Sequence, residues 1–526
     1  MSRKANIIFI MADQLAAPAL PAYGHKVVKA PHIQGLAERG AVFDAAYCNS
    51  PLCAPSRFSM LSGRLPSEIG AYDNAAEFPA TVPTFAHMLR LGGYRTVLSG
   101  KMHFVGPDQL HGFEERLTTD IYPADFGWTA DWERPERRLD FYHTMLSVVE
   151  ADACRRSQQI DFDEEVAYQA ERKIYDLARD GDERPFFLLV SFTHPHDPYT
   201  IGQEYWDLYR PEDIDLPAVP ALAREDMDPH SQRLHDALGL TDYALTEARI
   251  RNARRAYYGA ISYVDAQVGR LLEALEAAGL AEDSIVVFAA DHGDMLGERG
   301  LWFKMSFYEW SARVPLIVAA PERFGPGRIA RPVSLIDLFP TFQDLGGLAG
   351  LELPEDLPGR SLLPLIEGGE GGPGAVHGEY LGEAAVGPLL MIRRGRYKYV
   401  LGTDSPPQLF DLEADPQELS NLSGQAALAE VEDGFAREAA QRWDLEALRA
   451  EVIADQRRRR FVQEAQLIGA HTPWDFQPIF DASESYARNT RAILGDLENR
   501  ARLPYRESPA PDGPGAAPPK SWSRES

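Results

Sequence analysis

Cysteine is scarce in this chain of 526 residues. Its three cysteines are Cys48, Cys53 and Cys154. A set that is both sparse and odd in number does not make a disulfide framework. We therefore expect the protein to work in a reducing compartment, where thiols stay free.

Long apolar runs are also lacking. The N-terminal stretch "MSRKANIIFIMADQ" has two basic residues before an apolar run, as a secretion signal does, but the run ends at Asp13 and no small-residue cleavage site follows. No other stretch approaches the roughly 20 apolar residues that a membrane helix needs. We expect a cytoplasmic protein with no membrane partner.

Basic residues are few relative to acidic ones, with 53 Lys and Arg against 79 Asp and Glu and a formal net charge of −26. Such a field repels nucleic acid and anionic membrane, which excludes both as expected partners, and it tolerates or attracts a cationic substrate. The basic run "RRRR" at 457–460 is then interpreted as a solvated helix face or an oligomer contact.

Four short apolar runs are present, each followed by polar residues: "NIIFIM" (6–11), "YRTVLSG" (94–100), "FFLLVSF" (186–192) and "SIVVFAA" (284–290). Continuous apolar runs of this length are typical of buried parallel strands. Helical patterns lie between them, at 31–43, 81–93 and 265–280. The alternation predicts an α/β sandwich with a large, mainly parallel central sheet.

The residues that follow these runs carry the chemistry. They are Asp13, Lys101, His103, His194, His196, Asp291 and His292. Ligands of open α/β sheets bind beyond the carboxyl ends of the strands, so we expect one shared polar site there. An alternative for Asp291 and His292 is that they only cap the turn after their strand.

Two carboxylates and an imidazole, from Asp13, Asp291 and His292, suit a divalent cation such as Ca²⁺, Mn²⁺ or Mg²⁺. Four further groups would surround it with positive or proton-bearing atoms: Lys101, His103, His196 and Lys304. That ring suits an anionic group held on a metal, with acid and base partners for the leaving group. Lys304 alone could equally be a surface lysine.

The stretch "LCAPSRFSMLSG" (52–63) resembles the signature of the sulfatase family, Cys-x-Pro-Ser-Arg followed by a Leu-Ser/Thr-Gly step. The resemblance implies an alkaline-phosphatase-like fold in which a separate maturase oxidises Cys53 to formylglycine, the nucleophile. It implies one divalent metal, Ca²⁺ or Mn²⁺, held by Asp13, residue 53, Asp291 and His292, with Arg57 steadying the formylglycine hydrate. Gln14, where many sulfatases have a second Asp, is a further candidate ligand, and His292 stands where many have Asn.

Longer segments, among them 97–132, 191–199, 290–316 and 391–399, are similar to the choline sulfatases within that family. The implied substrate is choline O-sulfate, whose quaternary ammonium needs an aromatic face and a carboxylate. Trp128 and Glu383 are the candidates, although either could be structural.

The same resemblance assigns further substrate-binding positions. It places Asn74 at the sulfate and His143 at the head group, with Thr144 where the family tends to have Asn. It also implies a homotetramer, a dimer of dimers, in which Asp496 of the C-terminal extension helps to close a neighbour's pocket.

Three regions are expected: a catalytic domain at 1–370, a smaller α+β subdomain at 375–455 after the linker "EGGEGGPG", and an extension at 456–526. In the subdomain, 389–402 predicts a hairpin and 408–422 a strand, a turn and a helix. Four other functions stay open: a phosphonate monoester or phosphodiester hydrolase, a sulfatase for another small alkyl sulfate, a non-catalytic binding protein, and a thiol hydrolase with unmodified Cys53.

Overall fold

The architecture was analysed in a computed structural model that describes residues 4–139, 141–320, 323–372, 374–481, 486 and 502–504. Its centre is an eight-stranded sheet in the order β12-β2-β11-β9-β1-β7-β4-β5. The strands are β1 (Asn6–Ala12), β2 (Ala41–Phe43), β4 (Arg95–Gly100), β5 (Glu115–Arg116), β7 (Phe186–Phe192), β9 (Ser284–Ala290), β11 (Leu316–Ala319) and β12 (Gly327–Ile329). All run parallel except β11, which is antiparallel to both of its neighbours.

The four predicted strands are confirmed, and they are neighbours in the order β9-β1-β7-β4 at the centre of the sheet. Every residue of β1, β7 and β9 is buried, which explains why these segments read as continuous apolar runs. Their carboxyl ends therefore meet at one edge of the sheet.

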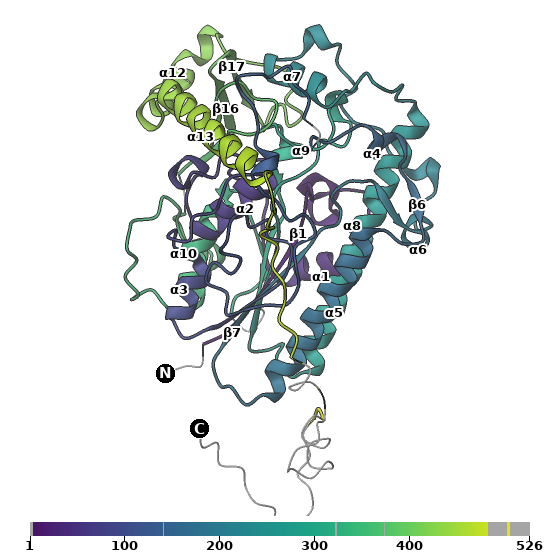
Figure 1. Cartoon of the computed structure of the whole chain (residues 1–526), viewed down its shortest axis with the longest axis vertical. Helices are drawn as coiled ribbons and strands as arrows, with labels where there is room; N and C mark the ends of the chain where they lie inside the picture. Colours follow the sequence, from purple (N-terminus) through teal and green to yellow (C-terminus); the bar gives the residue numbers. More distant parts are fainter. Residues whose placement is uncertain are drawn as a thin grey trace, which may run out of the picture.

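Helices cover both faces of the sheet (Figure 1). One layer holds α1 (Pro31–Arg39), α5 (Gln158–Arg179) and α8 (Glu247–Ala277), and the other holds α2 (Cys53–Ser62), α3 (Phe85–Leu91) and α10 (Leu338–Leu345). The predicted sandwich is thus confirmed. Shorter helices are α4 (Leu146–Val149), α6 (Gln203–Trp206), α7 (Pro229–Ala237), α9 (Glu309–Ala312) and α11 (Leu363–Ile366).

The helical pattern at 31–43 was wrong at its C-terminal end, because α1 stops at Arg39 and 41–43 form the strand β2. Gly40 lies between them, where the backbone passes so close to β11 that a Cβ atom would stand 2.6 Å from the carbonyl oxygen of Val318. Glycine alone permits this approach, and the chain turns there from the helix layer into the sheet.

A second, antiparallel sheet has the order β14-β15-β16-β17, from β14 (Val376–Tyr380), β15 (Leu389–Arg394), β16 (Tyr397–Gly402) and β17 (Ser405–Asp411). The predicted hairpin is β15–β16. The helix expected within 408–422 is wrong: after β17 the Asp411 carboxylate accepts the N–H groups of Glu413 and Ala414, and Glu418 has a positive φ, so the chain turns instead.

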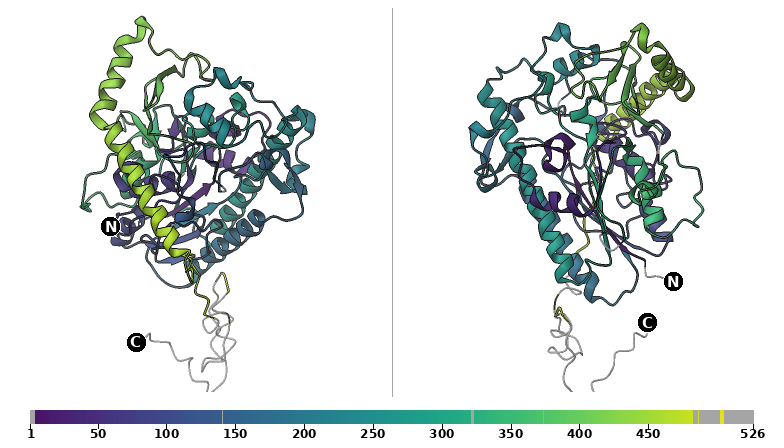
Figure 2. Two further views of the ribbon diagram at one scale, coloured as in Figure 1. Left: turned by 45° about the horizontal axis from the view of Figure 1, so that its top comes forward. Right: turned by 180° about the vertical axis from the view of Figure 1, so that it is seen from behind.

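Two helices follow, α12 (Ala429–Arg442) and α13 (Leu445–Gln466), and they lie along one side of the molecule (Figure 2). The smaller strands are β3 (Ala46–Tyr47), β10 (Arg313–Val314) and β13 (Val333–Ser334) in one sheet, and β6 (Asp152–Cys154) with β8 (Thr200–Gly202) in another. Across the described ranges, no helix combines the length and apolar character needed to cross a membrane.

The basic run 457–460 lies on α13 and is only in part the solvated face that the sequence suggested. Arg459 is only 4% exposed, and its guanidinium donates to both oxygens of Asp73. Arg460 forms an ion pair with Asp131, in a loop that packs on the helix. Arg457 and Arg458 are exposed, so the solvated face is right for half of the run, while Arg459 and Arg460 join α13 to the rest of the fold.

Candidate active site

Four parallel strands deliver their following residues to one place. Asp13 follows β1, Lys101 and His103 follow β4, His196 follows β7, and Asp291 and His292 follow β9. Helix α2 begins at Cys53 and is buried along its whole length, so it brings its first residue to the same edge. All these side chains are buried. The structure thus brings together the residues that the sequence placed at separate strand ends, except His194, whose Nδ1 lies 2.6 Å from Asp163 and which does not line the cavity described below.

The innermost group consists of Asp13, Cys53, Asp291 and His292, whose candidate ligand atoms all lie within 4.8 Å of one another. The Sγ atom of Cys53 is 3.2 Å from Nε2 of His292. Nδ1 of His292 lies 3.0 Å from the carbonyl oxygen of Gly293, which can only accept, so Nδ1 carries the proton and Nε2 turns its lone pair to the cluster. A neutral imidazole oriented in this way is a metal ligand.

Arg57 and Ser56, one turn into α2, fix Asp291. The Nε atom of Arg57 donates to Oδ2 of Asp291 at 2.8 Å, and Oγ of Ser56 donates to the Asp291 carbonyl at 2.5 Å. The Nη2 atom of Arg57 is buried, 3.8 Å from Oδ2 of Asp13, and has no hydrogen-bond partner among the described residues. It is therefore a donor still available to a ligand.

The cluster is electrostatically positive around Cys53. Burial alone would raise the pKa of the Cys53 thiol, but Lys101 and Lys304, joined by His292 in its protonated form, outweigh it and hold that pKa well below the usual value. Burial likewise would raise the pKa of Asp13, and Lys101, which is in hydrogen-bond contact with it, holds it low instead. The site is therefore arranged to hold negative charge at residue 53.

Lys304 is buried and not the surface lysine that its sequence context allowed. Its Nζ atom lies 2.7 Å from Oε1 of Gln14 and 2.9 Å from Nε2 of His196. The amide nitrogen of Gln14 donates to Asp294 at 2.7 Å. The Gln14 side chain is thus engaged by Lys304 and Asp294, and its oxygen is directed to the ammonium group rather than to the four-residue cluster.

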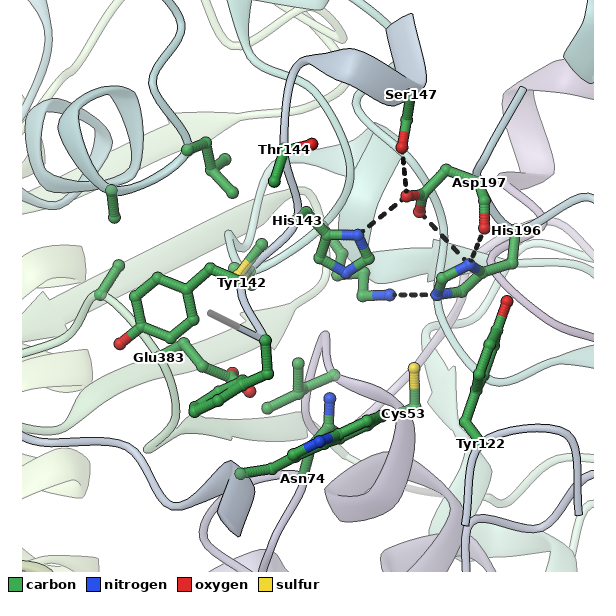
Figure 3. Close-up of a pocket in the computed structure, with 18 of the residues that line it drawn as sticks. Cys53, Asn74, Tyr122, Tyr142, His143, Thr144, Ser147, His196, Asp197 and Glu383 are labelled. Atoms are coloured by element: carbon green, nitrogen blue, oxygen red, sulfur yellow. Dashed lines mark hydrogen bonds and ion pairs between the residues drawn. The ribbon is translucent and has the colours of Figure 1, made fainter. Parts of the chain in front are cut away.

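A cavity of about 340 Å³ opens from Cys53 (Figure 3). Near Cys53 it is lined by Asn74, Lys101, His103, His196 and Lys304. Farther along its wall are Trp128, Phe141, Tyr142, His143, Thr144 and Glu383, which we call the head-group end. Trp128 stacks on Phe141 with ring centroids 6.2 Å apart. The cavity therefore joins a charged end to an aromatic one.

Glu383 is the carboxylate of the head-group end. It is buried, and its Oε2 atom has no hydrogen-bond partner within the described part of the chain. Burial, reinforced by Asp73, raises the pKa of Glu383 to about 8. A carboxylate left unpaired in an aromatic pocket is suited to a cation that cannot donate a hydrogen bond.

Asp197 was missed by the sequence reading, although it stands beside His196 in the segment "HPHDPY" that the reading used. Figure 3 shows His143, Ser147 and His196 converging on it; His143 Nδ1 is 3.0 Å away and Ser147 Oγ 3.1 Å away. Burial is the main cause that lowers the pKa of His143 to about 4, so its ring is neutral near pH 7. The alternating His-Pro-His-Asp pattern after a strand was the available signal.

Asn74 and His103 form the opposite wall near Cys53. The Oδ1 atom of Asn74 accepts the backbone N–H of Ala54 at 3.0 Å, which leaves its amide nitrogen as the free donor. The ring of His103 lies 3.2 Å from the Asn74 carbonyl, and Asp120, also missed, accepts the backbone N–H of His103 at 2.9 Å. Asp496 lies outside the described residues.

Three family models match parts of the chain. The family model described as Sulfatase matches residues 5–348, and the one described as Choline sulfatase enzyme C terminal matches residues 450–503. A third, described as N-sulphoglucosamine sulphohydrolase, C-terminal, matches residues 297–443.

Among curated proteins, the chain is 47% identical over 515 residues to the choline-sulfatase of Rhizobium meliloti (strain 1021), covering 96% of this chain and 99% of that protein. It is 30% identical over 453 residues to arylsulfatase K of Xenopus laevis, covering 80% of each. Among solved structures, the phosphonate monoester hydrolase of Agrobacterium radiobacter matches with a TM-score of 0.66 and 26% identity, covering 85% of this chain and 96% of that one.

Proposed function

The chain belongs to the sulfatase family, and from that premise we propose that it hydrolyses choline O-sulfate to choline and sulfate. The observation that carries the substrate is the cavity itself, which joins the buried Asp-Cys-Asp-His cluster to an aromatic end with an unpaired carboxylate. Choline O-sulfate has the matching arrangement, an anionic ester at one end and a quaternary ammonium at the other.

The donor set fits one divalent cation. Two carboxylates, residue 53 and an imidazole with a free lone pair converge in a buried space, and Asp13, residue 53, Asp291 and His292 would hold the ion. The oxygen-rich set suits Ca²⁺ or Mn²⁺. When bound, the ion would neutralise the sulfate oxygens and lower the pKa of the nucleophile.

Cys53 is the proposed site of the formylglycine, made by a separate maturase. The modified residue would supply a hydrated aldehyde as the nucleophile. The unpaired Nη2 of Arg57 stands one helical turn away and would donate to its oxygen, while Lys101 balances the negative charge of Asp13 beside it. Together these cations stabilise an oxyanion at residue 53.

Proton transfer is assigned to two histidines. His196 accepts from Lys304 through Nε2, and this pair would protonate the leaving oxygen of the ester. His103, across the cavity beside Asn74, would hold the proton of the nucleophile. The free amide nitrogen of Asn74 would donate to a sulfate oxygen.

The head group would be held by Trp128 through its ring face and by the ionised form of Glu383, which predominates above about pH 8, through its charge. His143, kept neutral by burial, would line the pocket without repelling the cation. We further propose a cytoplasmic homotetramer, a dimer of dimers, in which Asp496 of a neighbouring subunit closes the pocket.

The second candidate is hydrolysis of a phosphonate monoester or phosphodiester, and the likeness to the Agrobacterium radiobacter enzyme is the observation that favours it. A tetrahedral phosphoryl anion would fit the same charged end. The match of residues 450–503 to the choline sulfatase C-terminal model favours the sulfate ester. Relative turnover of choline sulfate and a phosphonate monoester separates the two.

The test combines two measurements on one sample: mass spectrometry of the tryptic peptide that contains Cys53, and release of sulfate from choline sulfate. A loss of about 18 Da, the aldehyde replacing the thiol, together with sulfate release supports the proposal. Full activity with unmodified cysteine, abolished by iodoacetamide, would replace the mechanism with that of a thiol hydrolase. Conversion without turnover of choline sulfate would move the search to another ester.

A further inference from the structure

Helix α13 lies directly behind the head-group end of the pocket, although none of its residues lines the cavity. Three pocket residues lie near this helix: Asn74 and Glu383 come from loops, and Trp128 ends the short 3-10 helix Phe126–Trp128. Next to each of them in the chain is a residue that is hydrogen-bonded to α13, either directly or through Trp132. Figure 2 shows the helix along the outside of the molecule.

The first tie is Arg459. Its guanidinium donates to Oδ1 of Asp73 at 2.6 Å and to Oδ2 at 2.9 Å, and Nη1 also reaches Oγ1 of Thr129 at 3.2 Å. Asp73 precedes Asn74, and Thr129 follows Trp128. The pair is almost fully buried, so its fork geometry is not loosened by water.

The second tie is Gln456, which is fully buried one turn earlier. Its Oε1 atom accepts the backbone N–H of Trp132 at 3.0 Å, and the indole N–H of Trp132 donates to the carbonyl of Gly382 at 2.9 Å. Gly382 precedes Glu383. The chain of two hydrogen bonds thus connects the helix to the pocket carboxylate.

We propose that Arg459 and Gln456 are positioning residues that set the geometry of the head-group end, a proposal that rests on the function proposed above. Loops without such support are the mobile parts of a fold, whereas a cation pocket needs its aromatic face and its carboxylate at fixed places. Most of the charged end needs no such support, because strand ends and α2 hold it; the exception is Asn74, whose neighbour Asp73 is bound by Arg459. Gln456 would therefore act on substrate selection and not on ester cleavage, whereas Arg459 would also hold Asn74 in place.

The most discriminating test uses Gln456, because it can be replaced by two residues of similar size, of which only one keeps the oxygen that accepts the Trp132 N–H. Gln456→Leu removes the acceptor of the Trp132 N–H, while Gln456→Glu keeps an oxygen there, and the lost amide nitrogen has no partner within the described residues. We expect Gln456→Leu to raise KM for choline sulfate at least about tenfold, since misplaced binding groups cost at least that much. Gln456→Glu should restore KM to near the unsubstituted value.

The matched substrate is 4-nitrophenyl sulfate, which has the ester but no quaternary ammonium. Its kcat/KM should stay within about twofold in Gln456→Leu, because the charged end is untouched. Arg459→Met should also raise KM for choline sulfate, but because it frees Asp73 beside Asn74 it should lower kcat/KM for 4-nitrophenyl sulfate as well. Arg459→Lys, which keeps the charge but loses the fork, should fall between Arg459→Met and the unsubstituted enzyme. The control is Arg458→Gln, at an exposed arginine of the same helix, which should leave KM and kcat/KM unchanged for both substrates.

Equal losses on both esters in Gln456→Leu, or no loss on either, would overturn the proposal. Failure of the proposed function is seen separately, in unsubstituted enzyme that cleaves the aryl ester but not choline sulfate. In that case hydrogen exchange decides: amides of 126–132 and 380–386 must lose protection in Gln456→Leu and keep it in both Gln456→Glu and Arg458→Gln. Unchanged protection would then refute the positioning role.

Discussion

The two ends of the pocket are built from different parts of the fold. At the charged end, Asp13, Lys101 and Asp291 follow strands of one parallel sheet, and their polar atoms are joined in a continuous network with Arg57. At the head-group end, Trp128, His143 and Glu383 come from loops, and the Glu383 carboxylate keeps an unpaired oxygen.

This difference separates two tasks. Under the proposed function, the sheet edge would fix the groups that any sulfate or phosphonate ester needs, and the chain is similar to a choline-sulfatase and to a phosphonate monoester hydrolase. The loops would hold groups that only a cationic ester needs. Substitutions at the charged end should therefore affect all esters equally, and those at the head-group end should affect choline sulfate alone.

The largest effect is expected from Cys53→Ala. Removing the nucleophile should lower kcat at least about 10⁴-fold on both choline sulfate and 4-nitrophenyl sulfate. Cys154→Ala, at a half-buried thiol far along the chain, is the control and should retain activity. Substantial turnover by Cys53→Ala would show that residue 53 is not the nucleophile.

The second-largest effect is expected from removal of the proposed metal ion. Chelation should lower the activity on both esters more than about a hundredfold, since the ion stabilises charge by several kcal/mol. Adding back Ca²⁺ or Mn²⁺ should restore it and raise the melting temperature, because the buried carboxylates of Asp13 and Asp291 regain a cation. Full activity in protein shown by elemental analysis to be metal-free would contradict the assignment.

The charged end of the pocket was easier to predict from the sequence than the head-group end, because the two are built differently. The charged end could be read because each of its strands is a continuous apolar run and the acid or base comes directly after it, as with Asp13 and Asp291. The hydrogen bonds of Gln14 could not be read, because they depend on Lys304 and Asp294, which lie some 280 to 290 residues away in sequence.

The head-group end had no comparable pattern. Trp128 and Glu383 were found only through resemblance. The run that contains Arg459 was interpreted as a solvated helix face or an oligomer contact, because four consecutive arginines carry no sign of which one is buried. A helix turns by 100° per residue, so one member of such a run must face inward if the helix packs. Only the tertiary partner, Asp73, identifies it.

The pH dependence of KM, measured with and without Glu383→Gln, tests whether the two ends of the pocket act separately. Burial and Asp73 raise the pKa of Glu383 to about 8, so the carboxyl is neutral below that pH and anionic above it. The cation is attracted only to the anionic form; KM for choline sulfate should therefore fall as the pH rises from about 7 to about 9. Glu383→Gln should remove this dependence and, at about pH 9, raise KM about tenfold or more.

The control for Glu383→Gln is again 4-nitrophenyl sulfate, whose KM should not follow the titration of Glu383. A parallel pH dependence for both esters would assign the titration to the charged end. Glu383 would then have no separate role in binding the cation, and the division of tasks between the two ends would be wrong.

The smallest effect is expected at Thr144, a half-buried residue of the head-group end. An amide there cannot receive a hydrogen bond from a quaternary ammonium, and its oxygen adds only a weak dipole beside the full charge of Glu383. Thr144→Asn should therefore change KM for choline sulfate by no more than about threefold, the lower end for a single polar contact. A tenfold gain would mean that this wall, and not Glu383, sets the affinity for the cation.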